Sequence, residues 1–277
     1  MAKLLIANAG AWQPSPEQFI SAVEQLHKED SVRREMESAR VSATREGSTH
    51  PSAENKARLL ARHLLLCELT DSGNTQAEHQ LCKRKVHLPI STYGKPLTAS
   101  YRDGNYSVTH VAEWVCCAHS KAAPLGIDVT AVHSQDSVPF SLCLTKEELV
   151  QAEAVPHNQW PSLFALFWTL KEAVLKALGL GLSTKLQMCD ICLDSVKLEN
   201  LSVLSNVEPA SVYTAPKSSL MISLQGNAKE AWACSSFMLP GHPPHILSVV
   251  LREKAMDGVV EVVFVSPQTA LRNSIIE

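Results

Sequence analysis

Apolar and polar positions follow two different periods along this chain. Short apolar or alternating runs predict strands at residues 4–7, 106–108, 114–118, 125–129, 220–224, 231–237, 246–251 and 259–265. Apolar residues that recur every three or four positions predict helices at residues 16–27, 54–69, 146–153 and 161–178. Polar composition predicts loops at residues 43–55 and 204–219 and a frayed tail after Val265. Because the strands come in hairpin-like pairs in two separate regions, we expect an α+β fold with antiparallel sheets.

Composition narrows the class of protein further. The chain has 277 residues, 45% of them apolar, and a net charge of −3. This length allows a sizeable core, and the near-neutral charge argues against nucleic-acid binding through phosphate contacts. The longest apolar runs are far shorter than the roughly 20 residues that span a bilayer, and the first residues are too short an apolar stretch for a secretion signal. We therefore expect a cytoplasmic protein that binds neither nucleic acid nor membrane.

The cysteines fit the same expectation. There are eight, and only Cys189 and Cys192 form a C-x-x-C pair. A zinc site would need a second such pair or a spaced pair of histidines. We expect reduced cysteines in the core of the protein.

The segment 161–178 carries the most informative side chains. An apolar face is formed by Leu163, Phe167, Leu170, Val174 and Leu178. Glu172 and Lys176 fall on the opposite side, one turn apart. The simpler interpretation is a solvent-facing ion pair worth a few tenths of a kcal/mol. The alternative is a carboxylate and an ammonium group presented together to a phosphate ligand, with the carboxylate on a divalent cation.

Other polar residues stand out against their surroundings. Asp128 lies within an apolar strand, where an unpaired carboxylate costs several kcal/mol, so we expect a turn, an arginine or a metal ion as its partner. Thr109 and His110 end a short strand, and Lys95 lies in a Gly-Lys-Pro turn. Arg58 and Arg62 lie one helical turn apart, and both could simply be exposed to solvent without binding a ligand. Each of these signals is weak when it is taken alone.

The order of these motifs is specific. Along residues 53–182 it runs from an arginine helix through Gly-Lys-Pro, Thr-His and Gly-Ile-Asp to Phe-Trp-x-x-Lys-Glu-Ala-x-x-Lys and Gly-x-Gly-Leu. This order resembles the Sfp-type 4'-phosphopantetheinyl transferases, and is most similar to their eukaryotic aminoadipate-semialdehyde-dehydrogenase type.

The resemblance implies a fold, a reaction and a set of partners. It implies two similar, pseudo-twofold halves with a cleft between them, and we divide the chain into residues 1–123 and residues 124–277. Such enzymes transfer the phosphopantetheine arm of coenzyme A to a serine of an apo acyl or peptidyl carrier protein, and they release adenosine 3',5'-bisphosphate. The carriers belong to fatty-acid, polyketide, peptide-synthetase or aminoadipate-reductase systems. A chain that carries both halves can form the cleft alone, so we expect a monomer.

The resemblance also implies residue roles. Asp128 and Glu172 would hold Mg²⁺, or Mn²⁺ in its place, and Glu172 would act as general base. Lys176 would neutralise the pyrophosphate. Coenzyme A would further contact four residues, which are Arg58, Lys95, Thr109 and His110.

The chain departs from the bacterial pattern at several positions, two of which concern the metal ion. Thr130 replaces a second acid, as in the eukaryotic type, where water takes its place. Val111 follows His110 and cannot bind a metal ion. If these changes reflect decay, the chain would be a non-catalytic coenzyme A-binding relative. A Mg²⁺-dependent phosphohydrolase is a third possibility, and it would need no carrier protein.

Overall fold

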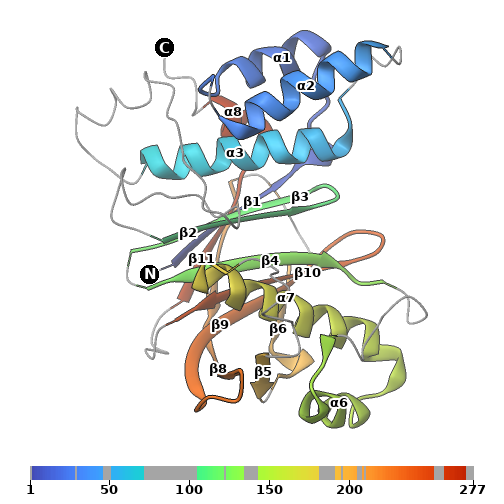
Figure 1. The fold of residues 1–277 in the computed structure, drawn as a ribbon, viewed down its shortest axis with the longest axis vertical. Coiled ribbons are helices and arrows are strands. Elements are labelled where there is room, and N and C mark those ends of the chain that lie inside the picture. The colour runs from blue at the N-terminus through green and yellow to red at the C-terminus, as the bar shows by residue number, and fades with distance from the viewer. Residues whose placement is uncertain are drawn as a thin grey trace.

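Two β-sheets pack face to face between two layers of helices (Figure 1). The computed structural model describes residues 2–28, 30–45, 51–71, 105–121, 123–133, 143–180, 191–194, 196–204, 208, 210–252 and 259–272. Within these ranges, every helix is too short or too polar to cross a membrane. The predicted α+β class is confirmed.

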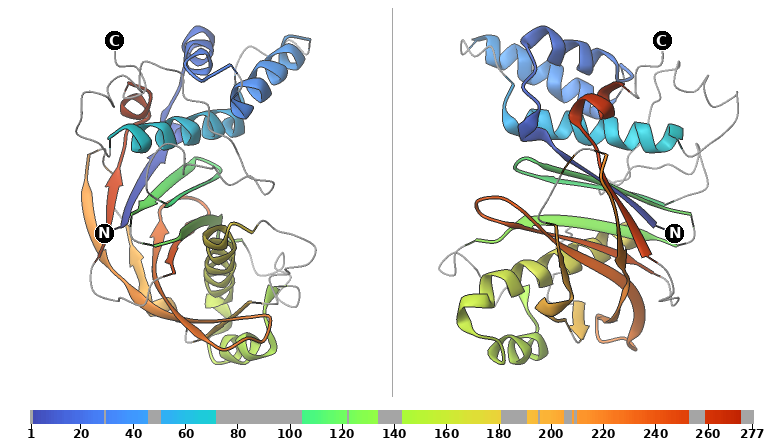
Figure 2. Two further views of the ribbon diagram at one scale, coloured as in Figure 1. Left: turned by 60° about the vertical axis from the view of Figure 1, so that its left-hand side comes forward. Right: turned by 180° about the vertical axis from the view of Figure 1, so that it is seen from behind.

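The helices cover the two outer faces of this sandwich, as the views in Figure 2 also show. On the side of the first sheet lie α1 (Pro16–Glu24), α2 (Ser31–Arg45), α3 (Ala53–Asp71) and α8 (Pro267–Arg272). On the side of the second sheet lie α6 (Lys146–Glu153) and α7 (Trp160–Leu178). Short 3₁₀ turns lie at Ala9–Ala11, His157–Gln159 and Leu198–Asn200.

Each sheet contains strands from distant parts of the chain. The first sheet has the order β2 (Asn105–Val111), β3 (Trp114–Ser120), β1 (Ala2–Asn8), β11 (Val259–Phe264) and β7 (Val212–Pro216). The second has the order β4 (Leu125–Ala131), β10 (His245–Leu251), β9 (Glu230–Leu239), β8 (Ser218–Leu224) and β5 (Ile191–Asp194), with β6 (Leu201–Val203) also paired to β9. Neighbouring strands are antiparallel except for two parallel pairs, β1 with β11 and β6 with β9. The sheets are therefore mainly antiparallel, as expected, and these two parallel pairs are the exceptions among the described strands.

The main core lies between the sheets. The first sheet contributes Leu4 and Ile6, and the second contributes Phe237 and Leu247, all fully buried. At one side of the sandwich, β7 continues into β8 with only Lys217 between them, so a single extended segment passes from the first sheet to the second.

The opposite side of the sandwich is a seam between two edge strands, β2 and β4. Here the Ile127 amide on β4 donates a hydrogen bond of 3.1 Å to the Ser107 hydroxyl on β2. Side-chain oxygens of β2 thus bond to the edge of β4.

Helix α7 packs unusually close to β4, and the sequence explains how. Pro161 lies in its first turn, and Gly179 ends it in the left-handed conformation with φ of 73°. A Cβ atom on Gly126 would lie 1.9 Å from the carbonyl oxygen of Ala173. Only glycine therefore allows this approach of α7 to the strand that carries Asp128.

Some predicted segments differ from the structure. The expected loop at residues 43–55 is wrong at both ends, since α2 extends to Arg45 and α3 begins at Ala53. The expected loop at 204–219 is also wrong, because it contains β7 and the start of β8. Part of the expected frayed tail is helix α8, and the helix predicted at 16–27 ends at Glu24.

These differences have physical causes. Helix α2 is polar over most of its surface, and the apolar side chains that it packs into the core are Val32 and Met36, four residues apart, so its apolar stripe is short and easily overlooked. Strand β7 is an edge strand, which tolerates Pro216 at its end. The division of the chain at residues 123 and 124 stays a prediction.

Candidate active site

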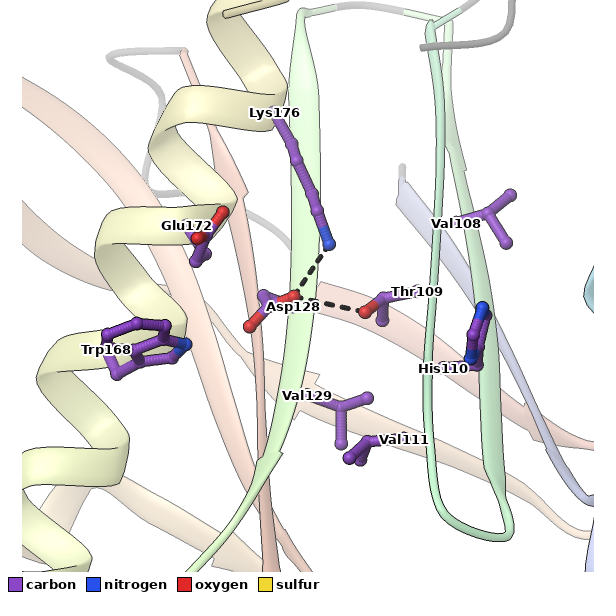
Figure 3. Close-up of a pocket in the computed structure, with 9 residues that line it drawn as sticks. All are labelled: Val108, Thr109, His110, Val111, Asp128, Val129, Trp168, Glu172 and Lys176. Atoms are coloured by element: carbon purple, nitrogen blue, oxygen red, sulfur yellow. Dashed lines mark hydrogen bonds and ion pairs between the residues drawn. The ribbon is translucent and has the colours of Figure 1, made fainter. Parts of the chain in front are cut away.

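A cavity of about 390 Å³ opens where β2, β4 and α7 meet at the seam. Figure 3 shows that its walls come from all three elements. They are formed by Val108, Thr109, His110, Val111, Asp128, Val129, Trp168, Glu172 and Lys176. Five of the seven site residues predicted from the sequence therefore line one cavity, although they come from three separate segments.

Asp128 lies at the centre of this group, between Lys176 and Thr109 (Figure 3). Its Oδ1 accepts a hydrogen bond of 2.6 Å from Lys176 Nζ and one of 3.1 Å from Thr109 Oγ1. The partners of this carboxylate are thus a lysine and a threonine, and not the turn or the arginine that was expected from the sequence. The Asp128–Thr109 bond crosses the seam and joins the two sheets within the cavity.

Glu172 does not form the solvent-facing pair with Lys176 that the simpler interpretation predicted. Only 8% of Glu172 is exposed, and Lys176 bonds to Asp128. Burial, and secondly the charge of Asp128, raise the pKa of Glu172 to about 7, against the opposing effect of Lys176. A carboxyl group with this pKa can accept or hold a proton near neutral pH.

The two acids also have the chemistry of a Mg²⁺ site. The negative charges of Asp128 and Glu172 repel one another, and a bound cation would offset this repulsion. Within the described residues, no group of three or more His, Cys, Asp or Glu side chains gathers in a metal-binding arrangement. Two carboxylates still suffice for Mg²⁺, because this ion commonly takes one or two of them and completes its shell with water and substrate phosphates.

His110 lines the same cavity as the two acids, and Arg58 on α3 lies near His110. His110 is partly buried, and its Nδ1 has no hydrogen-bond partner among the described residues. Burial lowers the pKa of His110, and the charges of Arg58 and Lys176 lower it further, while Glu54 and Glu35 raise it. Arg58 does not line the cavity, but its charge reaches His110.

The predicted Lys95 lies outside the described residues, so the structure does not place it. Val111 lines the cavity with an apolar side chain, as expected from the sequence. Sequence reasoning missed Trp168, which also lines it. Its spacing of four residues from Glu172 would have placed it on the same helix face.

Sequence reasoning also missed Lys171, which is fully buried beside Glu172 along the chain. Its Nζ donates 2.7 Å hydrogen bonds to Glu148 Oε2 and to the Cys143 carbonyl. Glu148 accepts a second bond, of 2.8 Å, from the Leu193 amide. This ion pair ties α7 to α6 and β5. A lysine in the middle of an apolar helix was the signal that could have revealed it.

Comparison with known proteins agrees with these motifs. Residues 124–234 match the sequence model of the 4'-phosphopantetheinyl transferase superfamily. The chain is 24% identical to the L-aminoadipate-semialdehyde dehydrogenase-phosphopantetheinyl transferase of Rattus norvegicus, over 89% of this chain and 73% of the relative, and 23% identical to that of Homo sapiens over the same shares. It is 28% identical to the 4'-phosphopantetheinyl transferase Sfp of Bacillus subtilis, over 46% of this chain and 56% of the relative.

Proposed function

We propose that this chain transfers the phosphopantetheine arm of coenzyme A to a serine of an apo carrier protein. The proposal rests on its similarity to a phosphopantetheinyl transferase over 89% of its length, at 24% identity, and on the family match over residues 124–234. The observation that carries this proposal is the convergence of Asp128 from β4 with Glu172 and Lys176 from α7 on one cavity. The other product is adenosine 3',5'-bisphosphate.

In the proposed reaction, the serine oxygen of the carrier attacks the pyrophosphate phosphorus that bears the pantetheine. The bond from this phosphorus to the bridging oxygen breaks, and the bridging oxygen leaves with adenosine 3',5'-bisphosphate. Glu172 accepts the serine proton as the general base. Lys176 offsets the negative charge that builds on the leaving oxygen.

Asp128 and Glu172 would hold Mg²⁺, which when bound supplies positive charge against the pyrophosphate. Asp128 also orients Lys176 through their 2.6 Å bond. Because a nearby cation lowers the proton affinity of a carboxylate, we expect Glu172 to take the proton late, as the serine oxygen bonds to phosphorus.

The remaining basic side chains would bind the adenosine phosphates. His110 and Lys95 would contact the 3'-phosphate, and Arg58 another phosphate. The buried Nδ1 of His110, which has no partner in the described part of the chain, supports its role as a hydrogen-bonding group for a ligand. Thr109 keeps Asp128 in place through their hydrogen bond and can add one to the ligand.

The setting of the enzyme belongs to the same proposal. We propose that it acts as a monomer in the cytoplasm. Cys116, Cys117 and Cys234 are buried thiols outside any disulfide, which agrees with a reducing compartment. The physiological carrier is one of the fatty-acid, polyketide, peptide-synthetase or aminoadipate-reductase classes.

Mass spectrometry of an apo carrier protein tests the proposal. Incubation with the chain, coenzyme A and Mg²⁺ should add one phosphopantetheine group to the carrier serine. Omitting the metal or introducing Glu172→Gln should abolish the gain, and Glu153→Gln, at an exposed position on α6, should leave it unchanged. No gain on carriers of all four classes, with coenzyme A still bound, would instead assign the chain as a non-catalytic coenzyme A-binding relative.

A further inference from the structure

Arg58 and Arg62 lie one turn apart on α3, but their ion pairs differ in kind. Arg62 bonds to Asp30 through a 2.6 Å contact from its Nε, and the two side chains are only 6% and 0% exposed. Arg58 bonds to Glu54 at 2.8 Å and also to Glu35, and all three side chains are between 38% and 51% exposed. Breaking a buried pair is costly, whereas an exposed pair contributes little. Arg58 is therefore the arginine that can exchange its partners.

Arg58 also belongs to a basic row that leads to the cavity, which we define as Arg58, His110 and Lys176. Glu54 Oε1 lies 3.9 Å from His110 Nδ1, so the carboxylate that bonds to Arg58 also approaches the imidazole. His110 and Lys176 line the cavity itself. A phosphate ligand that extends outward from Asp128 and Lys176 would pass His110 and reach Arg58 next.

We propose that Glu35 and Glu54 form an acidic clamp that competes with the ligand phosphates for Arg58. This inference builds on the proposed function, because it takes the ligand to be coenzyme A. Glu54 accepts from the Nε of Arg58 and Glu35 accepts from its Nη1, so a phosphate that uses these two donors must first displace the clamp carboxylates. The clamp therefore weakens the binding of coenzyme A and of the product adenosine 3',5'-bisphosphate, and so favours product release.

The fold allows the clamp to open without loosening α2. Glu35 belongs to α2, which is also held to α3 by the buried Asp30–Arg62 pair at its start. Met36 on α2 is only 2% exposed and packs in a core cluster with Leu59 of α3. These contacts do not involve Arg58, so they persist when a phosphate replaces the clamp.

Isothermal titration calorimetry at low salt tests the clamp. The ligands are coenzyme A and adenosine 3',5'-bisphosphate, and the variants are Glu35→Gln and Glu54→Gln. Glu37→Gln is the matched control, since it removes the same charge from an exposed position on α2 whose partner is Arg33. We expect each clamp variant to bind both ligands about two- to fivefold more tightly, as for the loss of a competing exposed ion pair. The control should bind like the wild type.

The same substitution in a protein that lacks Arg58 shows whether the gain in affinity depends on this arginine. In the Arg58→Ala protein, Glu35→Gln should no longer change the dissociation constant. Wild-type affinity in both clamp variants, or an equal gain in Glu37→Gln, would overturn the clamp while leaving the proposed function in place. A wild-type chain that binds neither ligand would overturn the proposed function, and the clamp with it.

Discussion

Replacing Gly126 by alanine should separate α7 from β4 and thereby pull the site apart. The added Cβ would lie 1.9 Å from the Ala173 carbonyl oxygen and 2.6 Å from the Ala177 amide nitrogen. Both atoms are backbone, so no side-chain rotation relieves the clash. An ordinary contact begins at 3.4 Å, so the helix must retreat by about 1.5 Å, the difference between the two distances.

This retreat would affect stability and activity together. Overpacking of this kind costs about 1–3 kcal/mol, and we expect the upper end because the helix itself must move. Ala173 and Ala177 directly follow Glu172 and Lys176, whereas Asp128 stays on the strand. A misplacement of about 1 Å can cost roughly 100-fold in rate, so kcat/KM should fall by about that factor or more.

The assay is the transfer reaction with a saturating apo carrier, together with urea unfolding. Gly226→Ala provides the control, since an added Cβ there has no neighbour within 4 Å while φ is 73°. That change should cost roughly 1–2 kcal/mol through backbone strain and leave kcat/KM unchanged. If Gly126→Ala kept both the stability and the activity of the wild type, the explanation of the α7–β4 contact would be refuted.

Three further changes probe other parts of the molecule. Lys171→Met should lower the free energy of unfolding, measured in urea, by about 3–5 kcal/mol, because it leaves the buried Glu148 without its cation. Lys197→Met removes the cation of an exposed pair and serves as the control. An equally small loss in both variants would contradict a stabilising role of the buried pair. Burial lowers the pKa of His63 from 6.5 in the unfolded chain to about 4 in the folded protein. Between these two pH values the imidazole is protonated in the unfolded state but not in the folded state. The free energy of unfolding should therefore fall by roughly 3 kcal/mol as the pH drops from 6.5 to 4. Between pH 7 and pH 4, the free energy of unfolding in urea should depend less on pH for His63→Gln than for the wild type. An identical pH dependence of the two proteins would show that His63 is not its cause. Lys95→Ala should raise the KM for coenzyme A with little change in kcat, and a pure kcat effect in steady-state kinetics would exclude a phosphate-binding role.

Much of the site could be predicted because its residues are spaced so that they lie on one face of a strand or of a helix. Gly126 and Asp128 are two apart on a strand, and Glu172 and Lys176 are four apart on a helix, so each pair shares a face. The sequence also showed that a carboxylate in an apolar strand needs a partner.

The identity of such partners could not be predicted, because it depends on packing between distant segments. Nothing local to Asp128 indicates that Lys176 would reach it across the α7–β4 contact, or that Thr109 would bond to it from another sheet. The same holds for Glu35, which meets Arg58 only because α2 packs on α3. The spacing of residues in the sequence predicts which of them share one face of a helix or strand. It does not predict which residues of distant segments that face will contact.

The parallel pairing of β1 with β11 has a consequence for how the chain acquires its structure. In the first sheet β11 lies between β1 and β7, although β1 begins at Ala2 and β11 begins only at Val259. During synthesis on the ribosome, β1 therefore lacks its neighbour on one side until the chain has been made as far as Phe264. Closing a contact of this sequence separation is slow, and the exposed edge of β1 can pair wrongly in the meantime. We expect a fragment that ends before β11 to expose this edge and to aggregate.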